Sequence, residues 1–146
     1  MKARVVAVCL GKEKGKPKED VRSGFLEAGY GLVGDAHAGM EKQVSILLKE
    51  HVDRLSRETG IVFPPGAFAE NLLIEGADEA LLEPGKRLKA GQAILQVERI
   101  GKEPGIAHSY HYHGYSLLPR LGVFARVIQD GIVKNGDEVE LITSTP

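Results

Sequence analysis

Glycine and proline divide this sequence into apolar segments of strand length. Eighteen glycines and seven prolines separate runs that are rich in β-branched residues. Parallel βαβ units would instead need several crossover helices of about ten or more residues. We therefore predict a mainly β fold, a closed or nearly closed β-barrel with one or two short helices. The runs are ARVVAV, NLLIEG, QAILQVERI, GVFARVI and DEVELI.

Helical periodicity is concentrated in one segment, SILLKEHVDRLSRETG. Leu48, Val52 and Leu55 recur there at helical spacing, and Gly60 offers a C-terminal stop. A second short turn is predicted around ADEALLEPG, where Pro84 ends it.

Two passages, RLKAGQAILQV (87–97) and IVKNGDEVELI (132–142), repeat one pattern. Each places a Lys-x-Gly turn between a short strand and a longer alternating strand. The Asn135-Gly136 pair is a strong hairpin signal, and the Ala-Gly pair at 90–91 is a weaker one.

Length and charge exclude several classes of protein. The 146 residues fit a single domain over 1–146, large enough to bury its own core. A net charge of -1 supplies no overall field for nucleic acid or for an anionic membrane. The apolar run in MKARVVAVCL is too short for a membrane span and lacks a cleavage site. We expect a soluble, cytoplasmic protein.

The only cysteine, Cys9, lies among alternating apolar residues and is interpreted as a core side chain facing the barrel interior. The lysine-rich stretch GKEKGKPKED (11–20) has no apolar periodicity. This stretch is either a solvated loop or a loop that steers anions.

Three motifs place polar residues where they could bind a ligand. GLVGDAHAG (31–39) surrounds a carboxylate and an imidazole with glycines, so that the backbone can approach a ligand closely. QVSIL (43–47) and PPGAFAENLLIEG (64–76) put polar residues beside apolar runs, either as structural hydrogen bonders or as ligand contacts. The candidate residues are Asp35, His37, Gln43, Ser45, Glu70 and Asn71.

The stretch GIAHSYHYHGYS (105–116) contains three histidines and three tyrosines. If it is extended, His111 and His113 share one face and have the His-x-His spacing that can hold a metal ion, with His37, Asp35 or His108 as further donors. Alternatively, the stretch lines a ligand pocket together with Arg120, or it is a plain surface loop. Arg126 is either a ligand contact or part of an ion pair.

The order of the motifs resembles the MOSC domain, named for the C-terminal domain of molybdenum cofactor sulfurase. The resemblance runs over nearly the whole chain, through GKPKEDV, GLVGDAHAG, QVSIL, PPGAFAENLLIEG, RLKAGQAILQVERIGK and LPRLGVFARVI. It implies a barrel of the pyruvate-kinase type and an association with the molybdenum cofactor (molybdopterin), molybdenum ion or pyridoxal phosphate. The ligand that it implies is an anionic pterin or oxoanion, held by Asp35, His37, Gln43, Ser45, Asn71, Arg120 and Arg126.

The resemblance also implies sulfurase-type catalysis, which depends on a cysteine in the family motif Cys-x-Met-Pro-Arg-x-Gly. Here SLLPRLG places Ser116 at that catalytic position. A hydroxyl cannot hold a sulfane sulfur or bind a soft metal comparably well. We therefore predict cofactor binding without sulfur transfer. The alternatives are an accessory domain that assists a cofactor-biosynthesis protein or a molybdoenzyme, and a metal-binding protein that uses the histidine stretch.

Overall fold

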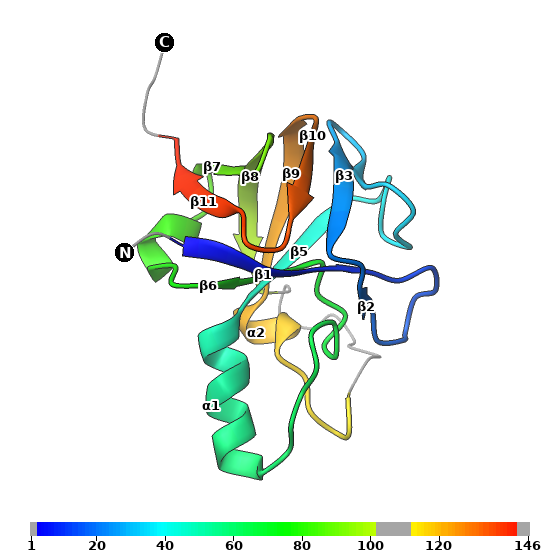
Figure 1. Ribbon diagram of the computed structural model, residues 1–146, viewed down its shortest axis with the longest axis vertical. Helices are drawn as coiled ribbons and strands as arrows, with labels where there is room; N and C mark the ends of the chain where they lie inside the picture. The colour runs from blue at the N-terminus through cyan, green and yellow to red at the C-terminus, as the bar shows by residue number, and fades with distance from the viewer. Residues whose placement is uncertain (1–2, 102–111, 143–146) are drawn as a thin grey trace.

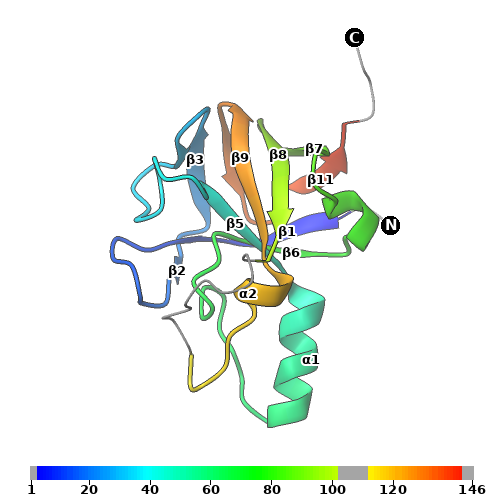
Figure 2. The same ribbon diagram turned by 180° about the vertical axis from the view of Figure 1, so that it is seen from behind.

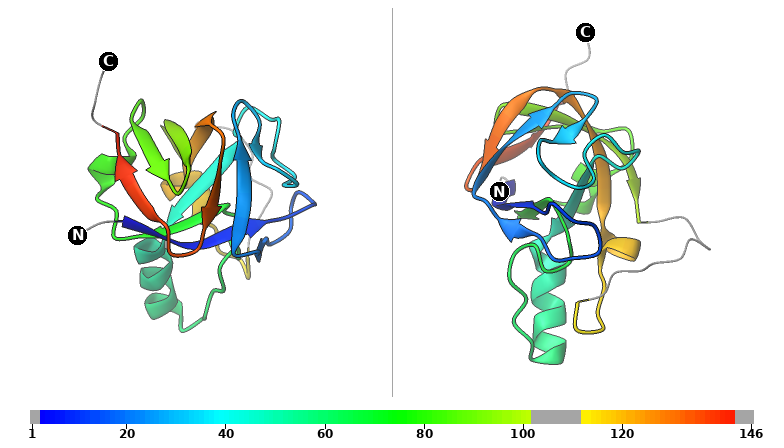
Figure 3. Two further views of the ribbon diagram at one scale, coloured as in Figure 1. Left: turned by 45° about the horizontal axis from the view of Figure 1, so that its top comes forward. Right: turned by 90° about the vertical axis from the view of Figure 1, so that its right-hand side faces the viewer.

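The strands of this protein form a closed barrel. The computed structural model describes residues 3–101 and 112–142. A pairing of strand β11 with strand β1 closes seven strands of the main sheet into a ring (Figures 1 and 3), which confirms the predicted fold class. In order around the ring, the strands are β1 (Ala3–Leu10), β6 (Leu72–Glu75), β5 (Val44–Leu48), β9 (Val123–Gln129), β8 (Ala93–Ile100), β7 (Arg87–Ala90) and β11 (Glu138–Leu141).

Four further strands lie outside this ring of seven. The short strand β2 (Glu19–Asp20) pairs with the last residues of β1. Strands β10 (Gly131–Lys134), β3 (Ser23–Glu27) and β4 (Gly31–Leu32) form a separate antiparallel sheet in that order. This small sheet positions the turn that follows β4, which contains GDAHAG.

Helix α1 (Lys49–Thr59) projects from one end of the barrel and connects β5 to β6 (Figures 1 and 2). Gly60 ends the helix, as predicted, because its positive φ of 75° lets its N–H bind the Ser56 carbonyl at 2.8 Å. The start of the predicted segment, SILL, belongs instead to β5, whose five residues are all buried. Strands β5 and β6 are the one parallel pair among the described strands, so the barrel includes one βαβ unit.

The described residues also form two shorter helical turns. The turn predicted around ADEALLEPG is the 3₁₀ helix η1 (Glu79–Leu82). Asp78 caps its start, because the Asp78 side chain accepts the N–H of Ala80 at 3.1 Å. Helix α2 (Leu118–Leu121) precedes β9. No helix in the described part of the chain has the length and apolar character needed to cross a bilayer.

The two predicted hairpins had different outcomes. The Ala-Gly turn at 90–91 joins β7 to β8, which pair with each other, so that prediction is confirmed. The Asn135-Gly136 prediction is wrong, because β10 pairs with β3, whereas β11 pairs with β7 and β1. Asn135 explains the difference: its Oδ1 accepts the N–H of Val8 at 2.9 Å and its Nδ2 donates to Asp20 at 3.1 Å. These bonds anchor the turn on β1, and the chain leaves one sheet there and enters the other.

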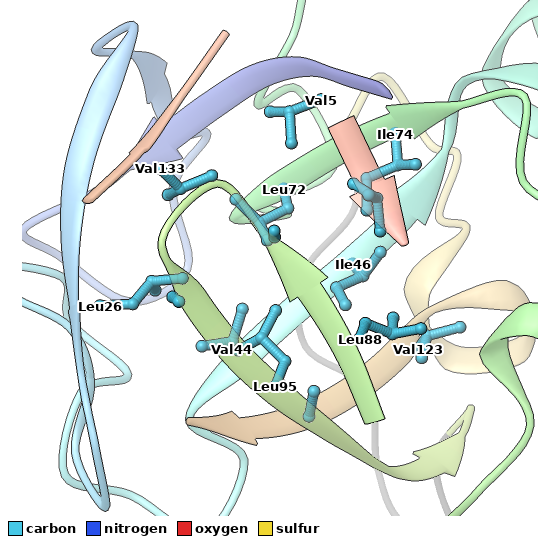
Figure 4. Close-up of a cluster of buried hydrophobic side chains, with 14 of the residues drawn as sticks. Val5, Leu26, Val44, Ile46, Leu72, Ile74, Leu88, Leu95, Val123 and Val133 are labelled. Carbon is cyan, nitrogen blue, oxygen red and sulfur yellow. The ribbon is translucent and has the colours of Figure 1, made fainter. Parts of the chain in front are cut away.

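Apolar side chains form two clusters. One fills the barrel and contains Val5 and Val8 of β1 (Figure 4). The other lies between the barrel wall, α1, α2 and the segment before β6, and it contains Ala7 and Cys9. The interpretation of Cys9 as barrel-facing is therefore wrong. A register shift between Val5 and Ala7 changes which side chains of β1 point inward.

Candidate functional site

Asp35 is the centre of a buried polar network in the turn after β4. Its side chain is fully buried and accepts hydrogen bonds from four donors. Two come from backbone N–H groups, of Gly11 at 3.0 Å and of His37 at 3.0 Å. The other two come from the ammonium of Lys18, which lies 2.9 Å from each carboxylate oxygen. Such bidentate, charge-assisted bonds hold a buried carboxylate in one orientation.

Both charged partners of this pair have shifted pKa values. Burial alone would raise the pKa of Asp35, but the His37 side chain beside it, hydrogen bonds from Gly11 and Lys18, and the Lys18 charge hold that pKa far below its usual range. Burial lowers the pKa of Lys18, and its hydrogen bond and ion pair with Asp35 oppose that change. Asp35 is therefore ionised at neutral pH and compensates the positive charge of Lys18.

His37 connects this network to the surface. Its Nδ1 lies 3.1 Å from the ammonium of Lys18, and 38% of its side chain is exposed. Lys18 itself is buried, with a side-chain exposure of 1%, so Nδ1 of the partly exposed ring lies against a buried ammonium. The expectation that Asp35 orients His37 is met in part: Asp35 binds the backbone of His37, and Lys18 binds the ring.

Lys18 also joins the GDAHAG turn to the GAFAEN segment. Its backbone N–H donates to the Gly66 carbonyl at 2.9 Å. A Cβ atom at Gly66 would lie 2.0 Å from the Lys18 carbonyl oxygen, and Gly66 has a φ of +86°, so only glycine fits this contact. Two motifs separated by about thirty residues in sequence thus meet at one lysine.

Glu70 stabilises the GAFAEN segment from inside. Its carboxylate, which is 1% exposed, accepts the N–H groups of Gly66 at 2.8 Å and Phe68 at 3.1 Å. Burial raises the pKa of Glu70, although these hydrogen bonds act in the opposite direction. Ala69, which precedes it, has a left-handed φ of +65°. Glu70 thus stabilises a tight loop. The left-handed backbone of Ala69 in this loop costs free energy, because its Cβ is crowded in that conformation.

Asn71, Ser45 and Gln43 make hydrogen bonds within the protein. Asn71 donates to the Cys9 carbonyl at 3.1 Å and accepts the N–H of Ser45 at 3.0 Å, so it links three strands of the barrel. The Ser45 hydroxyl accepts the N–H of Asn71 at 3.0 Å. Gln43 accepts the N–H of Val127 at 3.1 Å. Of the two interpretations left open for such residues, the observed bonds favour structural hydrogen bonding, and ligand contact stays a prediction.

The two candidate arginines have different environments. Arg126, on β9, forms an ion pair with Glu98 on β8 at 2.9 Å, and both side chains are exposed. Exposed pairs of this kind contribute little to stability. Arg120 lies exposed on α2. Among the described residues, no observed hydrogen bond or ion pair joins either arginine to Asp35 or His37, so their part in a shared pocket stays a prediction.

The end of the histidine stretch forms a tight turn. Tyr112 and Tyr115 exchange two backbone hydrogen bonds, of 2.8 and 2.9 Å, across His113 and Gly114, which both have positive φ. Both tyrosine rings contact Phe63, at centroid distances of 5.9 and 6.1 Å. The extended interpretation is wrong for this part, because the turn brings both rings to one side and leaves His113 exposed at its tip.

The remaining candidates in this stretch are placed as follows. Ser116 is half-buried just before α2. His108 and His111 lie outside the described residues. Within the described residues, no group of three or more His, Cys, Asp and Glu side chains could hold a metal ion. The metal site thus stays a prediction that rests on the sequence.

Lys18 is the member of this polar network that sequence analysis missed. It belongs to the lysine-rich stretch interpreted as a loop, in which Lys12, Lys14 and Lys16 are exposed. Only Lys18 is buried, at 4% exposure. Nothing in the sequence distinguishes it, because its burial depends on a carboxylate 17 residues away.

The fold is shared with bacterial proteins of solved structure. The YiiM protein of Geobacillus stearothermophilus is 23% identical, with a TM-score of 0.76 over 97% of this chain and 75% of that one. The YuaD protein of Bacillus subtilis is 20% identical, with a TM-score of 0.72 over 99% and 98% of the two chains. YiiM of Escherichia coli is 24% identical, with a TM-score of 0.68 over 99% and 71%. At these identities, the similarity shows a common barrel fold.

Part of the chain also matches a known family in sequence. Residues 33–100 match the MOSC domain, from the GDAHAG turn through GAFAEN to the end of β8. The MOSC resemblance that the order of the motifs indicated is confirmed over this part of the chain. No curated protein sequence matches it significantly.

Proposed function

We propose that this protein binds an anionic ligand of the molybdenum-cofactor class, a phosphorylated pterin or an oxoanion, and does not carry sulfur. The observation that carries the proposal is the Lys18–Asp35–His37 network, which holds an imidazole in one orientation at the surface. A pre-oriented donor gains affinity because it loses little freedom when the ligand binds.

Gly11 connects the Asp35 network to a hollow at the surface. Gly11 donates its N–H to Asp35 and accepts the N–H of Ala36 at 2.7 Å, and it also lines a hollow of about 420 Å³. Two lysines and two glutamates line this hollow, Lys12, Lys16, Glu13 and Glu19, and Lys16 forms an ion pair with Glu13. Leu10, Pro17 and Val21 contribute apolar surface. Lysine is a common phosphate binder, and an apolar wall suits a flat ring system.

The thiol part of the family chemistry does not fit this chain. Cys9 is the only cysteine, and it is fully buried in the second apolar cluster. Burial, and secondarily the charge of Glu70, raises the pKa of its thiol, so Cys9 does not form the thiolate that a persulfide or a soft metal needs. Ser116 offers only a hydroxyl. The residues present therefore fit the anionic part of the cofactor and not a sulfur ligand.

Ligand binding can be measured by isothermal titration calorimetry under anaerobic conditions, with molybdopterin released from a molybdoenzyme, molybdate and inorganic phosphate as separate probes. We expect saturable binding of at least one probe, weakened about 10- to 100-fold by His37→Ala, the usual cost of losing a hydrogen bond to a charged group. Lys134→Ala, which alters an exposed lysine of β10, is the matched control. Arg120→Ala tests whether α2 contributes to the same site.

Two results would contradict the proposal. The first is an absence of saturable binding by the folded chain; complex formation with a cofactor-biosynthesis protein would then favour the accessory role. The second is a mass gain of one sulfur atom after incubation of the native protein with a cysteine desulfurase and cysteine. Such a gain would show that the buried thiol of Cys9 does carry sulfur.

A further inference from the structure

We infer that Lys18 is a positioning residue, which holds His37 in the neutral tautomer with its hydrogen on Nε2 and so presents an N–H donor at the surface. The use of this donor for an anionic ligand rests on the proposed function. The tautomer itself does not, because it follows from contacts within the protein.

The tautomer follows from the donors and acceptors around Lys18. A lysine ammonium has three N–H donors and no acceptor. Two donors reach the carboxylate oxygens of Asp35 at 2.9 Å, and the third reaches Nδ1 of His37 at 3.1 Å. Nδ1 must therefore accept, and a neutral imidazole that accepts at Nδ1 carries its hydrogen on Nε2.

The alternative tautomer lacks a good partner. An N–H on Nδ1 would lie 3.1 Å from the ammonium of Lys18, which is itself a donor, and the distance from Nδ1 to Asp35 Oδ2 is 3.7 Å, beyond hydrogen-bonding range. That oxygen already accepts the backbone N–H of His37 at 3.0 Å. A neutral amine at Lys18 could accept from Nδ1, but it would leave the Asp35 carboxylate as a buried charge without compensation, which is strongly destabilising.

The position of Lys18 is fixed at both ends. Its backbone binds Gly66, and its ammonium binds Asp35. The backbone of His37 is fixed as well, through its bond to Asp35. The GAFAEN segment therefore acts on His37 through Lys18, whose backbone N–H is bound by the Gly66 carbonyl.

The tautomer can be measured by long-range ¹⁵N–¹H NMR of the protein labelled at its five histidines, without added ligand. The spectrum of His37→Gln assigns the His37 signals by their loss. We expect wild-type His37 to show a protonated Nε2 and an unprotonated, hydrogen-bonded Nδ1. Lys18→Met should abolish this single pattern, whereas Lys16→Met, the same substitution at an exposed lysine, should leave it unchanged.

A wild-type spectrum with the hydrogen on Nδ1, or a Lys18→Met spectrum identical to that of the wild type, would overturn the inference. If Lys18→Met does not fold, the wild-type spectrum alone decides the tautomer, and Lys18→Arg, which keeps the charge, decides whether a cation at this position maintains it. Failure of the proposed function is seen separately: the tautomer would be present, but molybdate, phosphate and molybdopterin would leave the His37 signals unmoved.

Discussion

Substitution of Lys18 by methionine is predicted to cost this protein a large part of its stability. Methionine fills the space of the lysine stem, so the substitution removes the charge and leaves little cavity. Asp35, whose side chain is fully buried, would lose two of its four hydrogen bonds and its counter-charge. Removing one partner of a buried ion pair typically costs about 3–5 kcal/mol. Asp35 keeps the N–H groups of Gly11 and His37, which favours the lower end of that range.

Urea unfolding followed by far-UV circular dichroism measures this loss. With a slope of about 2 kcal/mol per molar urea for a chain of this size, the midpoint should fall by roughly 1.5–2.5 M. The melting temperature should fall by about 6–20 °C. Lys16→Met, in the same stretch but exposed, should change the free energy of unfolding by less than about 0.5 kcal/mol.

A double-mutant cycle separates the charge from other effects of the substitution. Asp35→Asn keeps an acceptor for Gly11 while it removes the buried negative charge. The double variant Lys18→Met/Asp35→Asn should therefore be more stable than the sum of the two single changes implies, by about 1–3 kcal/mol. If Lys18→Met behaves like Lys16→Met, or if the two substitutions are additive, the buried pair does not stabilise the fold and the reasoning is refuted.

Three further predictions concern other residues. Ala69→Gly should stabilise the protein by about 0.5–1 kcal/mol in urea unfolding, because glycine relieves the left-handed φ of +65°, whereas Ala80→Gly in η1 should destabilise it. Cys9 should react with a thiol-specific reagent only in urea, since burial both shields it and raises its pKa; rapid reaction of the folded protein would contradict its placement. Because the folded pKa of Asp35 is depressed, its stabilising contribution should be present above about pH 4 and decline as the pH falls further, and Asp35→Asn should lack this decline.

The structure divides the residues of the family motifs into two groups. One group, Glu70, Asn71 and Ser45, forms hydrogen bonds with strands and loops of the barrel. His37 and the exposed lysines around Gly11 face outward. A motif can therefore be specific for this fold because its polar side chains are needed to build the barrel. Mutagenesis of ligand binding should therefore target His37 and these exposed lysines first, and Asn71 later.

Sequence patterns predicted the barrel and α1 well because both depend on local signals. The end of α1 was correct at Gly60, where a left-handed residue is needed. The predicted start of α1 was too early, because Leu48 satisfies the helical period but lies in strand β5, which is buried on both faces. The Asn135-Gly136 turn was misread, since its side-chain bonds to Val8 and Asp20 depend on strands more than a hundred residues away.

Within the candidate site, the sequence established which chemical groups are present. It showed an imidazole and a carboxylate set among glycines in GDAHAG, and it showed that no cysteine stands at the position of Ser116. Residue type decides such chemistry, because a hydroxyl cannot replace a thiolate wherever it lies. The tertiary structure alone decided that Lys18 is buried and that Cys9 faces the second cluster. Burial and hydrogen-bond partners depend on contacts between distant segments, which only the closed barrel brings together.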